Sequence, residues 1–198
     1  MRKHWGNSEL VVRAGMQRVF IGIPVDKHLQ KKINELSGPI KNSNPNLRWV
    51  AETNRHLTLA FIGNIPDLKV EILRRQFEQA YQGCSQFKYR FSRLARFPGA
   101  ASGIIALTGE PDTAMDHIFQ LTRRFLGNVG FDFDSKKFRP HVTLARIRRK
   151  QQLNTSFLHA TELNLAVDRV WLYQSSLTAS GSIYSTLEET MLSNAAES

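Results

Sequence analysis

The chain has 198 residues, which suits one domain with a full hydrophobic core. Hydrophobic residues make up 41% and charged residues 22%, a balance typical of soluble globular proteins, and no apolar run approaches the roughly 20 residues of a membrane helix. The formal net charge of +10 favours anionic partners such as nucleic acid or phosphorylated small molecules, although a basic surface without a specific partner would explain the charge equally well.

Cys84 is the single cysteine of the chain, which excludes an internal disulfide framework and a cysteine-based metal cluster. The basic N-terminus is not followed by the continuous apolar core of a secretion signal. We therefore expect a protein of the reducing cytoplasm, without a membrane partner.

The first part of the chain predicts an extension, a strand and a helix. Residues 1–17 are mostly polar and predict an extension that precedes the domain. The apolar run 18–25 predicts a strand, and Asp26 is a typical cap for a helix that runs to about Ser37. Gly38-Pro39 predicts the end of that helix.

The next part predicts a strand, a helix and another strand. A β-favouring segment that begins around Trp49 leads to His56-Leu57-Thr58-Leu59, and the strand that contains this motif is expected to end at Gly63-Asn64. Amphipathic spacing predicts a helix over 67–81, and alternating aromatic residues predict a strand over 87–97.

The following part predicts the same kinds of element again. A strand is expected over 104–107 and an amphipathic helix over 112–126. Residues 131–139 predict a short hairpin or loop, and Pro140 stiffens the entry into a strand that contains His141.

The C-terminal part is less clearly patterned. Residues 151–160 predict no defined element, 162–176 alternate like a strand, and 183–187 predict a last strand. Residues 191–198 predict a polar tail. Because no stretch resembles a flexible linker, we expect a single two-lobed domain over residues 18–190.

Two nearly identical tetrapeptides, His56-Leu57-Thr58-Leu59 and His141-Val142-Thr143-Leu144, carry the chemistry of this sequence. On a strand, residues i and i+2 point to the same face. Each tetrapeptide would therefore present an imidazole and a hydroxyl side by side, with its aliphatic residues on the other face. If the two strands meet, they form a site with two proton-transfer groups and two hydroxyl donors.

An internal repeat would bring the two motifs together. A shift of 85 residues (141 − 56) lays the run 19–23 on 104–108 and the segment 26–36 on 111–121. A shift of 76 lays 91–94 on 167–170. Each half then predicts a strand, a helix, a His-x-Thr strand and a further strand.

A histidine pair across a cleft suits general acid–base catalysis, since one imidazole can take a proton while the other gives one. A threonine hydroxyl beside each histidine can donate a hydrogen bond to a phosphate oxygen, and Arg146 can supply positive charge there. This chemistry requires no metal. Basic residues gather around the motifs, namely Arg55 before the first and Arg139, Arg146, Arg148, Arg149 and Lys150 around the second.

Other interpretations fit the histidines less well. A single histidine on a strand is usually structural, but two with threonine at +2 at matching positions of a repeat are harder to explain in that way. A zinc site would need a third ligand, and neither motif has a nearby cysteine or a Glu-x-x-His spacing. A Ser-His-Asp triad lacks its Gly-x-Ser-x-Gly turn. Phe20, Phe61 and Phe97 are expected in the core, with Phe20 and Tyr173 also possible members of a substrate rim.

The chain resembles the two-histidine phosphoesterase superfamily, and in particular its bacterial RNA 2′,3′-cyclic phosphodiesterases, formerly called 2′-5′ RNA ligases. The resemblance covers about residues 18–188 and rests on the two His-x-Thr motifs with the segments around them. These segments are Arg18–Pro24, Trp49–Gly63, Phe138–Arg146, and Leu172–Ser176 with Gly181 and Tyr184.

The resemblance implies an α+β fold with two lobes related by a pseudo-twofold axis, each an antiparallel sheet backed by helices, around a central cleft. It implies metal-independent hydrolysis of a 2′,3′-cyclic phosphate to a 2′-phosphate, without a cofactor. By position, His56 matches the proton donor and His141 the proton acceptor. Thr58, Thr143 and Arg146 match the phosphate-binding groups.

The expected partners are RNA with 2′,3′-cyclic phosphate ends, or cyclic nucleotides, and a monomer is expected. An alternative function is RNA-end binding or 2′-5′ ligation in the same cleft. Because the sequence has no nucleotide-triphosphate motif to drive joining, we expect hydrolysis and assign the activity of an RNA 2′,3′-cyclic 3′-phosphodiesterase.

Overall fold

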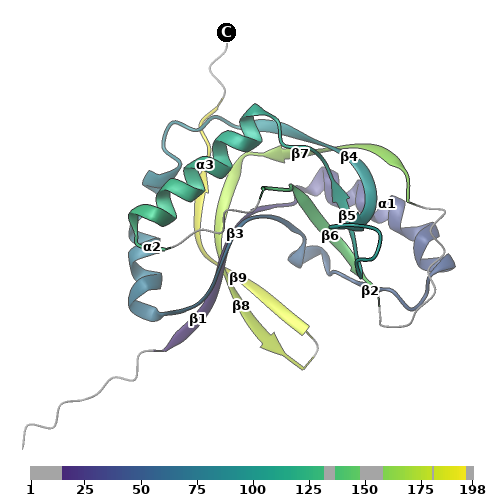
Figure 1. The fold of residues 1–198 in the computed structure, drawn as a ribbon, viewed down its shortest axis with the longest axis horizontal. Helices are drawn as coiled ribbons and strands as arrows, with labels where there is room; N and C mark the ends of the chain where they lie inside the picture. Colours follow the sequence, from purple (N-terminus) through teal and green to yellow (C-terminus); the bar gives the residue numbers. More distant parts are fainter. Residues whose placement is uncertain (1–14, 132–136, 148–157, 180, 195–198) are drawn as a thin grey trace, which may run out of the picture.

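The computed structural model describes residues 15–131, 137–147, 158–179 and 181–194, which fold around one curled antiparallel sheet (Figure 1). The strands are β1 (Met16–Pro24), β2 (Arg48–Trp49), β3 (His56–Pro66), β4 (Phe87–Phe97), β5 (Ile104–Thr108), β6 (His141–Arg146), β7 (Ala160–Val167), β8 (Arg169–Thr178) and β9 (Gly181–Met191). The helices are α1 (Lys27–Ser43), α2 (Asp67–Ala80) and α3 (Thr113–Asn128), with a 3₁₀ turn η1 (Glu52–Asn54).

The sheet has the order β7-β4-β5-β6-β3-β1-β8-β9, and β2 pairs with β6. This order is symmetric about the seam between β6 and β3, since β3-β1-β8-β9 on one side matches β6-β5-β4-β7 on the other. The shift of 85 residues carries the apolar run of β1 onto β5 and the start of β3 onto the start of β6. The predicted α+β class and pseudo-twofold halves are therefore confirmed, with the two halves joined into one sheet.

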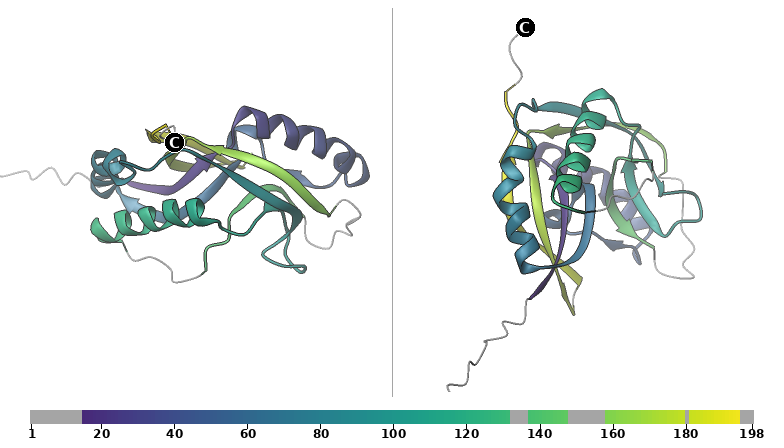
Figure 2. Two further views of the ribbon diagram at one scale, coloured as in Figure 1. Left: turned by 90° about the horizontal axis from the view of Figure 1, so that it is seen from above. Right: turned by 60° about the vertical axis from the view of Figure 1, so that its left-hand side comes forward.

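The two halves are interlocked by an exchange of strands. β4 follows the first half along the chain but pairs with β5 of the second, and β8 returns from the second half to pair with β1. In Figure 1, α2 and α3 lie together at one end of the sheet and α1 at the other, and the side view in Figure 2 shows the sheet curling between them. Each half therefore completes its part of the sheet with a strand that follows the other half along the chain.

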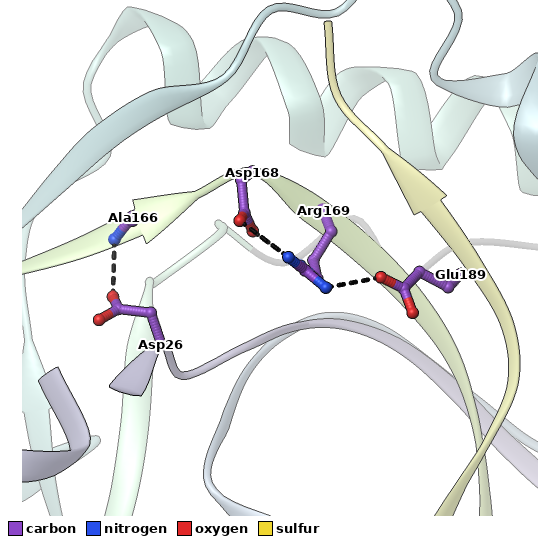
Figure 3. Close-up of polar contacts among 5 residues, drawn as sticks. All are labelled: Asp26, Ala166, Asp168, Arg169 and Glu189. Carbon is purple, nitrogen blue, oxygen red and sulfur yellow. Dashed lines mark hydrogen bonds and ion pairs between the residues drawn. The ribbon is translucent and has the colours of Figure 1, made fainter. Parts of the chain in front are cut away.

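The chain passes from β7 to β8 at a corner held by charged side chains (Figure 3). The guanidinium of Arg169 donates to both carboxylate oxygens of Asp168, at 3.0 and 3.1 Å, and to Glu189 Oε1 on β9 at 2.7 Å. The predicted single strand over 162–176 is consequently wrong, because Asp168 ends β7 and β8 begins a pairing with the other half of the sheet.

Helix α1 is longer than predicted and passes through Gly38-Pro39. Proline lacks the N–H that would bond to the carbonyl four residues earlier, so the helix loses one internal hydrogen bond there. The next turn is retained because the Ile40 side chain is buried and the backbone N–H of Asn44 donates to the carbonyl oxygen of Ile40 at 2.9 Å. Burial of this last turn offsets the missing bond.

The strand boundaries also differ from those predicted. His56 and His141 begin β3 and β6, although we expected the segment that leads into the first motif to begin around Trp49. Met16 and Gln17 belong to β1 and not to an extension. At the C-terminal end, Leu192 is 6% exposed and packs on the core, so it is not part of the predicted polar tail.

Several predictions concern residues outside the described ranges. These are most of the N-terminal extension (1–14), the central residues of the 131–139 loop, Arg148, Arg149 and Lys150, most of 151–160, and residues 195–198. None of the helices within the described ranges combines the length and the hydropathy that crossing a lipid bilayer requires.

We expect Asp26→Ala to lower the free energy of unfolding by about 1–3 kcal/mol. The Asp26 carboxylate accepts from Leu29 N at the start of α1 at 2.9 Å, as predicted. It also accepts from Ala166 N of β7 at 2.9 Å (Figure 3). Loss of an N-cap costs about 0.5–2 kcal/mol and loss of a hydrogen bond about 0.5–1.5 kcal/mol. Urea denaturation measures the change.

Asp112→Ala is the matched control, because Asp112 caps α3 through Met115 N in the same way. It should cost the cap contribution alone. Equal losses in the two variants would show that the bond between α1 and β7 does not stabilise the fold.

Candidate active site

The two predicted motifs meet at the seam of the sheet, where Leu57 of β3 pairs with Val142 of β6. Both of these side chains are fully buried. The strands are antiparallel, so His56 lies on the side of Thr143 and Thr58 on the side of His141. Alternation turns these four partly exposed side chains to the face opposite the buried pair. We call this face of the sheet the site face.

A backbone carbonyl fixes the same tautomer on both histidines. His56 Nδ1 lies 2.8 Å from the carbonyl oxygen of Asn54, and His141 Nδ1 lies 2.9 Å from that of Arg139. A carbonyl can only accept, so in each ring Nδ1 must carry the hydrogen. Nε2 is left as the atom that takes or gives a proton on both rings.

The two residues that supply these carbonyls are themselves held through their side chains. Asn54 Nδ2 donates to the carbonyl of Ser182 at the start of β9, and Arg139 Nη2 donates to that of Pro98 in the β4–β5 turn, each at 2.8 Å. We did not predict this positioning role from the sequence. The signal available is the shared location two residues before each histidine.

Aromatic rings enclose His56 on the side of β1 and β8. The ring centroid of His56 lies 4.7 Å from that of Phe20, 5.6 Å from Tyr173 and 5.3 Å from Tyr184. Phe20 and Tyr173 are each 3% exposed, so they offer no surface to a substrate and their predicted place in a rim is wrong. They form a wall that orients the imidazole.

Phe97 stacks on His141, with ring centroids 3.9 Å apart and planes inclined by 20°. The guanidinium of Arg139 covers the Phe97 ring at 4.9 Å. We expected Phe97 in the core, but it is half-buried on the site face. A hollow of about 220 Å³ lies beside this stack, lined by residues of β4, β5 and the Arg139-Pro140 segment.

Burial keeps both imidazoles in the neutral form. It lowers the pKa of His56 to about 4, a change that the hydrogen bond to Asn54 opposes and a charge on His141 would increase. Burial also lowers the pKa of His141. The hydrogen bond to the carbonyl of Arg139 acts against this lowering, and the positive charge of the Arg139 side chain adds to it. An anion bound between the rings would raise both pKa values.

Gly22 of β1 gives the His56 ring room to lie against the sheet. A Cβ atom at this position would lie 2.8 Å from the Leu57 carbonyl oxygen and 3.4 Å from His56 Cδ2. Any other residue would push the motif strand away from β1. A glycine inside an apolar strand was the sequence signal for this close approach.

A β-bulge brings Arg146 to the site face. The register between β5 and β6 shifts so that Ala106 faces Thr143 and Ile105 faces Ala145, which leaves Leu144 as the extra residue. Arg146 then pairs with Ile104, and Ile104 pairs with Phe97. Because the Phe97 ring stacks on His141, Arg146 lies on the same face as His141. Without this bulge, alternation would place Arg146 on the opposite face.

Arg55 does not contribute charge to the site, contrary to our expectation. Its side chain is 5% exposed, and its Nη1 donates to Gln30 Oε1 and Asn34 Oδ1 of α1 at 2.8 and 2.9 Å. It belongs to the face opposite His56 and fixes η1 against α1. Within the described ranges, no three His, Cys, Asp or Glu side chains come together as they would to hold a metal ion.

Known proteins resemble this chain in sequence and in fold. A sequence model described as the 2′-5′ RNA ligase superfamily matches residues 25–178. An RNA 2′,3′-cyclic phosphodiesterase of Thermotoga maritima is 28% identical over 176 residues, which cover 87% of this chain and 94% of that protein.

Solved structures agree with the fold. The crystal structure of E. coli LigT in apo form superposes with a TM-score of 0.74 at 23% identity, covering 90% of this chain and 99% of LigT. The structure of LigT complexed with 3′-AMP superposes with a TM-score of 0.67 at 21% identity, with the same coverage.

We expect His56 to make the stability of the protein depend on pH in the acid range. Its pKa is about 4 in the folded protein and about 6.5 in an unfolded chain. Between these values the unfolded chain binds more protons, so the contribution of His56 is complete above about pH 6.5 and is lost as the pH falls toward 4. His56→Gln should flatten this part of the curve of unfolding free energy against pH.

His117→Gln, on the exposed side of α3, is the control for removing a histidine. A curve for His56→Gln that keeps the slope of the parent protein would show that the imidazole is not held neutral by burial.

Proposed function

The chain belongs to the 2′-5′ RNA ligase superfamily of two-histidine phosphoesterases, and from this membership we propose that it is an RNA 2′,3′-cyclic 3′-phosphodiesterase. The observation that carries the proposal is the seam of the sheet. Two imidazoles lie on one face beside two threonine hydroxyls. Each ring bonds a backbone carbonyl through Nδ1, so its Nε2 is not engaged in that bond. The curated relative described above bears the name of this activity.

In the proposed reaction, water attacks the phosphorus atom of a 2′,3′-cyclic phosphate, and the bond from phosphorus to the 3′ oxygen breaks. His141 Nε2 takes a proton from the water, while His56 Nε2 gives a proton to the departing 3′ oxygen. The product is a 2′-phosphate with a free 3′ hydroxyl. Exchange of protons with solvent then restores both imidazoles.

Three further groups would hold the phosphate in this reaction. The hydroxyls of Thr58 and Thr143 lie beside the histidines and can donate to its non-bridging oxygens. The guanidinium of Arg146 would balance the negative charge that these oxygens gain in the transition state. Such donors act strongly where water is excluded, and the aromatic rings around both histidines reduce access of water.

The low pKa of His56 must be raised before this residue can act as an acid. The substrate itself supplies the change, because a cyclic phosphate carries one negative charge into the site. The charge acts on both imidazoles, and it acts more strongly on the more enclosed ring because less water screens it. His56 would therefore become the proton donor as the substrate binds.

A direct assay tests the proposed function. We expect the protein to convert 2′,3′-cyclic AMP, and RNA ended by a 2′,3′-cyclic phosphate, to 2′-phosphates in the presence of EDTA. Tight binding of the RNA end without turnover, or the joining of ends, would favour RNA-end binding or 2′-5′ ligation and would overturn the hydrolase proposal.

We expect His56→Ala and His141→Ala each to lower kcat by about 10²–10⁴-fold, the usual contribution of a general acid or base. Because both act in one displacement, the double variant should be little slower than either single one. His117→Ala on α3 is the control for an exposed histidine. A nearly normal rate in either single variant would contradict paired acid–base catalysis.

The rate of this reaction should follow a bell-shaped curve against pH. The free protein needs one charged and one neutral imidazole, and both pKa values lie below the usual 6.5. The maximum of kcat/KM should therefore lie below about pH 6.5. The maximum of kcat should lie at higher pH, since bound substrate raises both values. A flat profile between about pH 5 and 9 would indicate another catalytic group.

We expect Arg146→Ala to weaken catalysis by about 1.5–3 kcal/mol, the contribution of a charge-assisted hydrogen bond to phosphate. The loss in kcat/KM should persist at high salt. Arg124→Ala removes the same charge from the exposed surface of α3 and should have a smaller effect that fades with salt. Equal, salt-sensitive losses would mean that Arg146 acts only through the general positive field.

A further inference from the structure

A basic hollow lies beside His141 in the second half of the site. Its volume is about 220 Å³, and the charged side chains that line it are Arg93, Arg96, Glu110 and Arg139. Three guanidinium groups therefore face one carboxylate. The proposed reaction gives no function to this excess of positive charge, because the motif threonines and Arg146 would hold the reacting phosphate.

Strand pairing places Arg93 on the site face, in line with His141. His141 of β6 pairs with Thr108 of β5, and Arg93 of β4 pairs with the same threonine. Directly paired residues point to the same face of a sheet, and Phe97, four residues further along β4, stacks on His141 from that face. Because neighbouring strands are about 4.8 Å apart, the backbone of Arg93 lies roughly 10 Å from that of His141. Its long side chain can therefore reach an anion next to the reacting phosphate.

The protein does not neutralise the charge of Arg93. Within the described ranges, none of the ion pairs involves this exposed residue. The carboxylates of this region have other partners, since Glu162 of β7 pairs with Arg90 at 3.3 Å and Glu110 pairs with Lys137 at 4.0 Å. An anion that enters the hollow therefore does not have to displace a carboxylate from Arg93.

The pseudo-twofold repeat relates Arg93 to a neutralised arginine in the other half. The shift of 76 residues carries Arg93 onto Arg169 and Ser92 onto Asp168. Arg169 donates to both carboxylate oxygens of Asp168 and to Glu189. A serine has no charge with which to neutralise Arg93 in this way, so the guanidinium of the second half keeps its charge for a ligand.

The other guanidinium near the site in the first half is engaged by an aromatic ring. Arg18 lies two residues before Phe20 on β1, and its guanidinium is 4.9 Å from the ring centroid of Phe61. Phe61 is 58% exposed, although we expected it in the core, and its ring takes up one side of the guanidinium by a cation–π contact. Arg93 and Arg139 of the second half are therefore better placed to bind a second anion.

The chemistry of the hollow suits a phosphodiester. A guanidinium binds phosphate oxygens through two parallel hydrogen bonds, and proteins that hold single-stranded RNA follow its backbone with positive charge. In the substrate of the proposed reaction, the phosphate that follows the cyclic phosphate most closely along the strand is the phosphodiester before the terminal nucleotide. This group can occupy the hollow while the cyclic phosphate lies between the histidines.

We propose that Arg93, together with Arg139, forms a second phosphate subsite, which binds the phosphodiester that precedes the terminal nucleotide of the RNA. The proposal rests on the proposed function and adds to it how the rest of the strand is held. Contacts to backbone phosphate carry no sequence information. The subsite therefore favours an RNA strand over a free cyclic nucleotide without selecting a base sequence.

The experiment compares two dinucleotide substrates, ApA ended by a 2′,3′-cyclic phosphate and the same compound with an uncharged methylphosphonate linkage. We expect kcat/KM of the parent protein to be about 10–150-fold higher for the charged dinucleotide, the effect of one charge-assisted hydrogen bond. Arg93→Ala should remove most of this preference and leave kcat/KM for the methylphosphonate unchanged.

Arg90→Ala is the matched control, because it removes a guanidinium from the same strand that is already paired with Glu162. This variant should keep the preference for the charged dinucleotide. If Arg90→Ala and Arg93→Ala lost the preference equally, both would act through the general positive field, and the subsite would be overturned.

The remaining outcomes separate the subsite from the activity. Equal kcat/KM values of the parent protein for the two dinucleotides, or an equal loss for both in Arg93→Ala, would overturn the subsite while leaving the hydrolase proposal intact. If the parent protein hydrolyses neither dinucleotide, the proposed function fails. Calorimetric titration of the parent and of Arg93→Ala with the charged dinucleotide then tests the subsite, and equal affinities of the two proteins would overturn it.

Discussion

The structure depends on one antiparallel contact, the pairing of Leu57 with Val142 at the centre of the sheet. Because side chains alternate along a strand, this register buries two aliphatic residues and turns two histidines and two threonines to the opposite face. A slip of one residue would exchange the two sets. Burial of the aliphatic pair and assembly of the proposed catalytic groups are therefore one event, so the protein cannot fold correctly without bringing these groups together.

The surroundings of the histidines set their protonation before any substrate arrives. Rings on β1, β4, β8 and β9 exclude water, and backbone carbonyls two residues earlier fix the hydrogen on Nδ1. The exclusion of water favours a neutral ring, whereas the carbonyl bond opposes this effect and determines that the neutral ring presents Nε2. The free site thus contains little positive charge on its imidazoles, and in the proposed reaction the charge of the bound substrate would form the acid.

The two halves share a backbone pattern but differ in the side chains that complete it. Each half has a bulge directly after its His-x-Thr motif, at Leu59 or Leu144, and each bulge turns the second following residue to the site face. This residue is phenylalanine in one half and arginine in the other. A symmetric frame can thus hold a symmetric phosphate at its centre and still distinguish the two sides of a substrate.

The sequence alone predicted the repeat and the four motif residues, because strand alternation and a repeat of 85 positions can be recognised directly in the order of the residues. The α+β class was implied by the resemblance of the motifs to those of a known family. From the sequence we expected Phe61 and Phe97 in the core and Arg55 near the site, since the type of an aromatic or charged residue does not indicate which face of a sheet it occupies. Those faces depend on bulges and on pairing between distant strands. Only the tertiary structure decided them, because a single extra residue in a ladder reverses the direction of every side chain that follows.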